Sequence, residues 1–125
     1  MRAASMGRAA SLNESRVERF AEALLVASGT EYLRHEPVEG VTVPDFVVPR
    51  WRVAIFVDGD YWHTNPRAFP NGPATEIQRI NLARDTESRA VLVARGWTVV
   101  RIWEWDLKND PVGVARRLAS LSADE

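Results

Sequence analysis

The chain has 125 residues, a hydrophobic content of 46% and a formal net charge of −1 at pH 7. This length and composition predict a single domain with a hydrophobic core of its own. Cysteine is absent, which excludes a disulfide framework and a cysteine-ligated zinc site. No apolar run approaches the roughly 18 residues of a membrane span and no signal-peptide pattern occurs, so we expect a cytoplasmic protein without a membrane partner.

The distribution of charge is more informative than its sum. Residues 50–101 hold eight arginines against five acidic residues, and Lys108 is the only lysine against fifteen arginines in the whole chain. Arginine stays charged and contacts phosphates through two parallel hydrogen bonds, so an arginine-based phosphate surface is one interpretation. Solvated helix faces explain most of these charges equally well.

The first predicted elements are an arm and a helix. Residues 1–12 are rich in small residues and predict a flexible arm, followed by one domain over residues 13–125. Ser11 and Glu14 have the spacing of a capping box, and apolar residues follow at helical spacing. We therefore expect a helix over about residues 13–28, which Gly29 ends.

Three strands, a long loop and a second helix follow. The strands are expected at about 30–35, 41–48 and 51–57, the last being nearly continuously apolar and therefore central. Residues 58–73, with three prolines and two glycines, predict a loop. A helix over about 75–95, a strand over 97–103 and a helix starting at Asp110–Pro111 complete the chain. The predicted fold is α/β, in the order α-β-β-β-α-β-α, with a mixed four-stranded sheet flanked by helices.

Asp45 stands out because it interrupts an otherwise apolar strand. A carboxylate is costly to bury there unless it binds a metal or another partner. The alternative is an edge-strand acid that faces water. The pattern alone leaves both interpretations open.

Residues 57–63 end the strongest strand with two carboxylates, an aromatic pair and a histidine. Functional side chains gather on such loops, and magnesium is held by one or two carboxylates together with waters and phosphate oxygens. Asp45 could supply one ligand and the main-chain carbonyl of Val57 another. His63 could orient or deprotonate an attacking water, since an imidazole accepts a proton near neutral pH. Alone, His63 could equally be a loop histidine that caps a polar group.

Several short blocks follow one another along the chain. They are Glu18 eleven residues before Gly29, Asp45, residues 55–63 (IFVDGDYWH), residues 81–85 (NLARD), Leu92, residues 96–97 and residues 103–104. In this order they resemble the very short patch repair (Vsr) endonucleases of the PD-(D/E)XK superfamily. That family has a helix-one glutamate about eleven residues before a glycine, an aspartate at a strand end, a run closing on aromatic-Trp-His, an Asn-x-x-Arg-Asp motif, a leucine, a Gly-Trp pair and a Trp-Glu pair.

The resemblance implies a role for each matched residue. Asp45 would be the principal Mg²⁺ ligand, with Mn²⁺ a substitute ion, the backbone of Val57 a second ligand, and His63 the catalytic histidine. Glu18 and Asp85 would be further catalytic acids, which hold metal-bound waters or orient the histidine. The DNA-binding set would be Tyr61 and Trp62, an aromatic pair that wedges between base pairs, with Met6 assisting from the arm, and Arg67 and Arg84 as phosphate contacts.

The chain departs from the family at positions that bear on metal binding and on recognition of the DNA substrate. An ordinary PD-(D/E)XK site has a lysine two residues after its second acid, but Lys108 lies far downstream, so His63 would take its place. The family's structural zinc has no ligand set here, because only His35 and His63 remain. Asp58 stands where the family has a second histidine, and it could act as an extra metal ligand. These changes leave specificity for a T·G mismatch open.

The main hypothesis is therefore a Mg²⁺-dependent endonuclease that hydrolyses a phosphodiester of double-stranded DNA, in the cytoplasm of a bacterium or encoded by a phage. One small domain has one active site, so it should nick a single strand. A homodimer or a larger recognition partner remains open. The alternative is an inactive nuclease fold that serves as a DNA-binding or protein-interaction module. A purely structural α/β protein fits the surplus of aromatic and acidic residues least well.

Overall fold

The computed structural model describes the backbone of residues 8–121 and the side chains of residues 15–121. The first helix, α1 (Arg8–Ala27), begins earlier than the sequence indicated. Ser11 lies inside this helix, so the predicted capping box does not start it, and residues 8–12 of the expected arm are helical. Gly29 follows the helix with a φ of 77°, a left-handed conformation that glycine adopts without steric cost.

The sheet is mixed and has the strand order β1-β2-β3-β4. Its strands are β1 (Leu33–Arg34), β2 (Phe46–Val48), β3 (Val53–Asp58) and β4 (Thr98–Trp103). β1 and β2 pair antiparallel, as do β2 and β3, whereas β3 and β4 are parallel. Along the chain, the predicted succession of three strands before the long helix and one strand after it is confirmed, but the first two strands are much shorter than expected.

Much of the segment between β1 and β2 that was expected to be strand is a loop. Residues 36–45 leave the sheet, apart from an isolated bridge between Val38 and Thr42. Glu39 and Gly40 adopt positive φ angles of 55° and 68°, which an extended strand does not allow. Asp45 therefore lies at a bend immediately before β2, and its predicted place in the middle of a strand is wrong.

The two longer helices that follow β3 begin close to the positions that the sequence predicts. α2 (Glu76–Ala94) starts at a capping box that Thr75 and Gln78 form together. α4 (Pro111–Ala119) starts at Asp110, whose side chain accepts a hydrogen bond from Gly113 N. A 3₁₀ turn, η1 (Pro49–Trp51), and a short helix, α3 (Glu104–Asn109), were not predicted.

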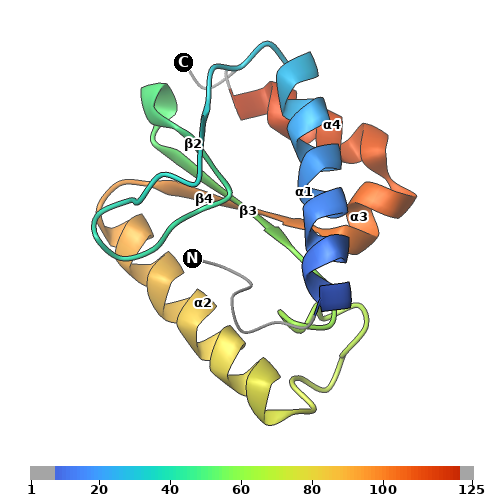
Figure 1. Ribbon diagram of the computed structural model, residues 1–125. Coiled ribbons are helices and arrows are strands. Elements are labelled where there is room, and N and C mark those ends of the chain that lie inside the picture. Colours follow the sequence, from blue (N-terminus) through green and yellow to red (C-terminus); the bar gives the residue numbers. More distant parts are fainter. Residues whose placement is uncertain (1–7, 122–125) are drawn as a thin grey trace.

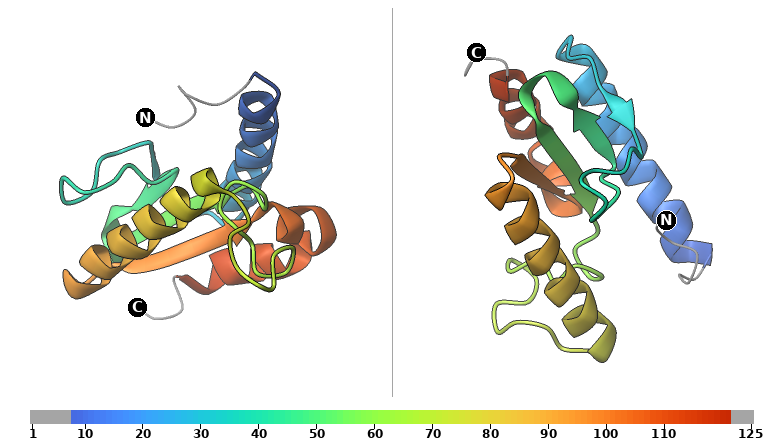
Figure 2. Two further views of the ribbon diagram at one scale, coloured as in Figure 1. Left: turned by 90° about the horizontal axis from the view of Figure 1, so that it is seen from below. Right: turned by 90° about the vertical axis from the view of Figure 1, so that its left-hand side faces the viewer.

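The helices cover both faces of the sheet, as Figure 1 and the right-hand view of Figure 2 show. On one face, Val17, Ala21 and Leu25 of α1 form a core with α3, α4 and alternate strand residues such as Ile55 and Val57. On the other face, Leu92 of α2 packs with Ala54 and Phe56. This arrangement confirms the predicted α/β class with a flanked, mixed four-stranded sheet.

The parallel crossover from β3 through α2 to β4 determines where a site can form. Residues 59–75 leave the carboxyl end of β3 and return to the start of α2 at one end of the molecule (Figure 1). Ligand sites in open α/β sheets lie outside the carboxyl ends of such strands. Within residues 8–121, no helix combines the length and the apolar character that crossing a bilayer would require.

Candidate functional site

Asp45 is fully buried, with 0% of its surface exposed. Its Oδ2 accepts a hydrogen bond of 2.7 Å from the main-chain N–H of Val57 at the end of β3. Its carbonyl oxygen accepts another, of 3.1 Å, from His35 N. The alternative of an edge acid facing water is therefore wrong. The hydrogen bond holds Asp45 against β3 at Val57, the residue whose carbonyl was predicted to bind the same metal ion.

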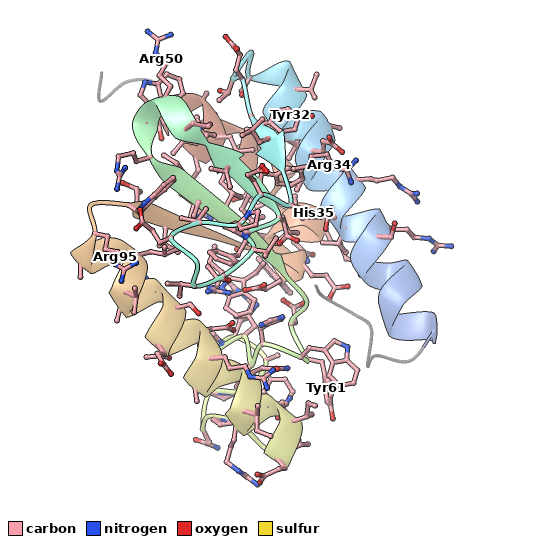
Figure 3. The ribbon with its side chains drawn as sticks, turned by 60° about the vertical axis from the view of Figure 1, so that its left-hand side comes forward. Tyr32, Arg34, His35, Arg50, Tyr61 and Arg95 are labelled. Carbon is pink, nitrogen blue, oxygen red and sulfur yellow. The ribbon has the colours of Figure 1, made fainter. Side chains whose placement is uncertain are left out.

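Asp45 belongs to a group that we call the α1 cluster: Glu18, His35 and Asp45. One potential ligand atom from each residue lies within 4.8 Å of the other two. His35 Nε2 is 2.8 Å from Glu18 Oε2, and Figure 3 shows His35 and Arg34 beside α1. The side chain of Glu18 is 17% exposed and that of His35 48%, so the cluster opens to solvent on one side.

The second group, which we call the loop cluster, consists of Asp58, His63 and Asp85, again with ligand atoms within 4.8 Å of one another. His63 Nδ1 is 2.7 Å from Asp85 Oδ2, and His63 Nε2 is 3.6 Å from Asp58 Oδ1. The imidazole thus lies between two carboxylates. Strand alternation sends Val57 to the core under α1 and Asp58 to the face of α2.

Arg101 on β4 compensates the charge of the loop cluster. Its Nη1 forms an ion pair with the fully buried Asp58 and lies 3.7 Å from Asp85 Oδ2. The guanidinium also lies over the ring of Phe56, 5.1 Å from its centroid. A buried carboxylate with a guanidinium partner is neutralised in place, which makes Asp58 less available to a cation.

The four acidic and histidine positions predicted from sequence therefore meet in two neighbouring groups. Glu18 and Asp45 lie on the α1 side of the end of β3, and His63 and Asp85 lie on the α2 side. The two groups are linked through β3, because Val57 contacts Asp45 and Asp58 is the next residue. The oxygen-rich donors of the α1 cluster fit a hard divalent cation such as Mg²⁺ or Mn²⁺.

The predicted DNA-contacting residues are arranged around the loop. Tyr61 is 46% exposed and packs edge-on against the partly buried Trp62, with ring centroids 5.0 Å apart. Neither side chain belongs to a core cluster of the described residues. Arg67 lies over the ring of Trp105, 3.7 Å from its centroid, and Arg84 is exposed on α2. Met6 lies outside the described residues.

Sequence reasoning missed several residues at this site. His35 was noted only as a remaining histidine, and its place beside Glu18 depends on a left-handed backbone with a φ of 50°. The ion pair of Arg101 with Asp58 depends on the register between β3 and β4. Gln78 and Asn81 donate hydrogen bonds to the carbonyls of the loop, although Asn81 had been matched only as the first residue of a family motif and was given no role. A Thr-x-x-Gln pattern marks Gln78 as a cap, but nothing local indicates its second contact.

Comparison with known proteins identifies the family of this chain. A family model described as DNA mismatch endonuclease Vsr matches residues 1–67, more than half of the chain. The chain belongs to the Vsr family. The matched segment contains Glu18, Asp45 and His63, whereas Asp85 lies beyond it.

Individual relatives extend the match further along the chain. The type II nicking enzyme V.XorIIP of Xanthomonas oryzae is 30% identical over 101 residues, which cover 76% of this chain and 74% of that protein. The DNA mismatch endonuclease Vsr of Escherichia coli is 30% identical over 108 residues, covering 82% of this chain and 69% of the relative. The catalytic domain of the homing endonuclease I-Bth0305I has a similar fold, with a TM-score of 0.65, 23% identity and coverage of 86% and 93%.

Proposed function

We propose that this member of the Vsr family is a DNA endonuclease that uses a divalent cation to hydrolyse one phosphodiester of double-stranded DNA. The observation that carries the proposal is the pair of acid and histidine clusters on either side of the end of β3. One cluster offers oxygen ligands to a cation, and the other holds an imidazole between two carboxylates. Phosphodiester hydrolysis requires both functions within reach of one phosphate.

Asp45 is the proposed principal ligand, with Glu18 beside it and the carbonyl of Val57 as a main-chain ligand. The buried position of Asp45 keeps its carboxylate fixed, because Val57 N donates to one of its oxygens. A divalent cation bound there would polarise the phosphate and stabilise the charge that develops on it. Mg²⁺ is the proposed physiological ion and Mn²⁺ a substitute, since both favour carboxylate and carbonyl oxygens. Asp58 is the weaker metal-ligand candidate because of its ion pair with Arg101.

His63 is the proposed base. Asp85 Oδ2 lies 2.7 Å from Nδ1 and favours the tautomer that carries a proton there, which leaves Nε2 free to accept one from the attacking water. After the transfer, the positively charged imidazolium lies between the carboxylates of Asp85 and Asp58. Arg101 prevents these two acids from forming an uncompensated negative pair before the transfer.

The loop residues are proposed to contact the duplex. The edge-on pair of Tyr61 and Trp62 presents flat apolar side chains beside His63, suited to stacking on an unstacked base step. Arg67 and Arg84 are the proposed phosphate contacts, with Met6 of the arm assisting the aromatic pair. One chain contains one such site, so a single chain should nick one strand, and double-strand cleavage would require a second copy or a second event.

The test is nicking of supercoiled plasmid in Mg²⁺ or Mn²⁺ by the wild type, Asp45→Ala and His63→Ala, with Glu87→Gln as a control for loss of an exposed acid on α2. We expect cation-dependent conversion to open circles by the wild type and the control, and loss of conversion in both site variants. Full activity of Asp45→Ala would overturn the metal assignment. A folded wild type that binds duplex DNA but nicks nothing would instead support the inactive binding module.

A further inference from the structure

Three residues of α2 contact three consecutive residues of the loop. Gln78 Nε2 donates a hydrogen bond of 2.7 Å to the carbonyl of Tyr61, and Asn81 Nδ2 donates one of 2.9 Å to the carbonyl of Trp62. Asp85 Oδ2 contacts His63 Nδ1 at 2.7 Å. Positions 78, 81 and 85 lie on one face of the helix, so a single rigid surface holds all three loop residues.

Gln78 joins this surface to the start of its own helix. It is fully buried, and its Oε1 accepts hydrogen bonds from Ala74 N and Thr75 N at 2.7 and 3.1 Å. Its main-chain N–H donates to Thr75 Oγ1. The two atoms of the Gln78 side-chain amide therefore make different contacts: the oxygen caps α2, and the nitrogen binds the loop at Tyr61. A cap alone requires only the oxygen, because glutamate serves equally well at this position of a capping box.

Asn81 fixes the peptide that leads into His63. Its hydrogen bond orients the carbonyl of Trp62, which belongs to the same planar peptide unit as the N–H of His63. Asp85 fixes the other end of the same residue at the imidazole. The backbone and ring of His63 are thus attached to one helix face at two points, four residues apart.

We propose that Gln78 and Asn81 are positioning residues, which make the aromatic pair and His63 move as one unit with α2. The inference rests on the proposed function. Stacking of Tyr61 or Trp62 on DNA would then also set the distance from His63 to the phosphate, because one helix face holds both. A displacement of about 1 Å in a reacting group can reduce a rate by about a hundredfold, so two short hydrogen bonds at this place have a measurable effect.

Isosteric variants separate this role from the stability of the helix. Gln78→Glu keeps the oxygen that caps α2 and removes the donor to Tyr61. Asn81→Leu removes the donor to Trp62 without adding a charge. Thr75→Ala weakens the cap and leaves both loop contacts in place, so it is the control for a purely structural effect.

The first measurement is amide hydrogen exchange of the free protein, which requires no activity. We expect faster exchange over residues 59–69 in Gln78→Glu and Asn81→Leu, with exchange in the body of α2 unchanged. The second is plasmid nicking in Mn²⁺ over a range of DNA concentrations that reaches saturation. We expect kcat to fall about tenfold in each variant, with KM changed less than about twofold. Thr75→Ala should retain the wild-type kcat below its unfolding temperature.

A third comparison uses the Asp85→Asn background. Asn81→Leu should lower kcat less there than in the wild type, because both residues act on the placement of His63. Unchanged exchange in the loop, or unchanged kcat with a loosened loop, would overturn the inference while leaving an active wild type and the proposed function intact. A wild type that does not nick in either metal would overturn the proposed function, and this inference with it.

Discussion

The α1 cluster and the loop cluster contain the same types of residue but differ in what surrounds them. In the α1 cluster, the nearby cation is Arg34, whose side chain is 51% exposed and lies 3.4 Å from Glu18. In the loop cluster, it is Arg101, 19% exposed and paired with a fully buried Asp58. An exposed arginine can turn into solvent when a metal arrives, whereas a buried one cannot leave without isolating a charge. This difference is our reason for proposing that the α1 cluster binds the metal ion and that the loop cluster transfers the proton.

The largest expected effect comes from removing one key residue of each cluster. Asp45→Asn and His63→Gln should each reduce nicking about a thousandfold, within the range that one essential base contributes. Only Asp45→Asn should also abolish Mn²⁺ binding, measured by calorimetry without DNA. Retained Mn²⁺ affinity in Asp45→Asn, or its loss in His63→Gln, would reverse the assignment of the two clusters. Glu87→Gln is again the matched control.

The next effect concerns the stability of the loop cluster. Arg101→Met should lower the free energy of unfolding by about 3 kcal/mol, because it leaves Asp58 as a buried charge without its guanidinium. The double variant Asp58→Asn/Arg101→Met should recover most of this loss in urea unfolding. If Asp58 were instead a metal ligand, Arg101→Met would bind Mn²⁺ more tightly than the wild type. Equal affinities would support a structural ion pair.

The residues of both clusters that stand in local sequence patterns could be predicted from the sequence. The contacts that make the two clusters different join residues far apart in the sequence and could not be predicted. Asp45, His63 and Asp85 stand at element ends or in a motif, where local pattern is informative. Arg101 and Asp58 lie 43 residues apart, and their contact depends on the register of a parallel strand pair. His35 lies beside Glu18 with a left-handed backbone at the end of β1, and residues 41–45, where the apolar pattern had indicated a strand, belong to a loop. Periodicity identifies strands better than it identifies where they end.

A smaller effect should follow from His35, which gives the α1 cluster its nitrogen donor. Imidazole is a better ligand for Mn²⁺ and later transition metals than for Mg²⁺. His35→Ala should therefore weaken Mn²⁺ binding about tenfold and Mg²⁺ binding less than about twofold. Arg34→Gln is the control, since it removes another neighbour of Glu18 that cannot bind a metal. Equal losses for the two ions would show that His35 only orients Glu18.

The smallest effect lies far from both clusters, where Glu39 attaches loop 36–45 to the opposite end of β4. The pKa of Glu39 lies below its ordinary value of 4.5, chiefly because Trp97 Nε1 donates a hydrogen bond to its carboxylate. The positive charges of Arg95 and Arg52 lower this pKa further. A carboxyl group whose pKa is lower in the folded state than in the unfolded state stabilises the fold. This stabilisation is fully present when the pH is above the unfolded-state pKa, and it is lost as the pH falls through the folded-state pKa. The melting temperature of the wild type should therefore fall slightly more than that of Glu39→Gln as the pH drops below 4.5. Nicking at neutral pH should be the same in both proteins, because loop 36–45 ends at Asp45 and the buried hydrogen bond to Val57 holds that end independently.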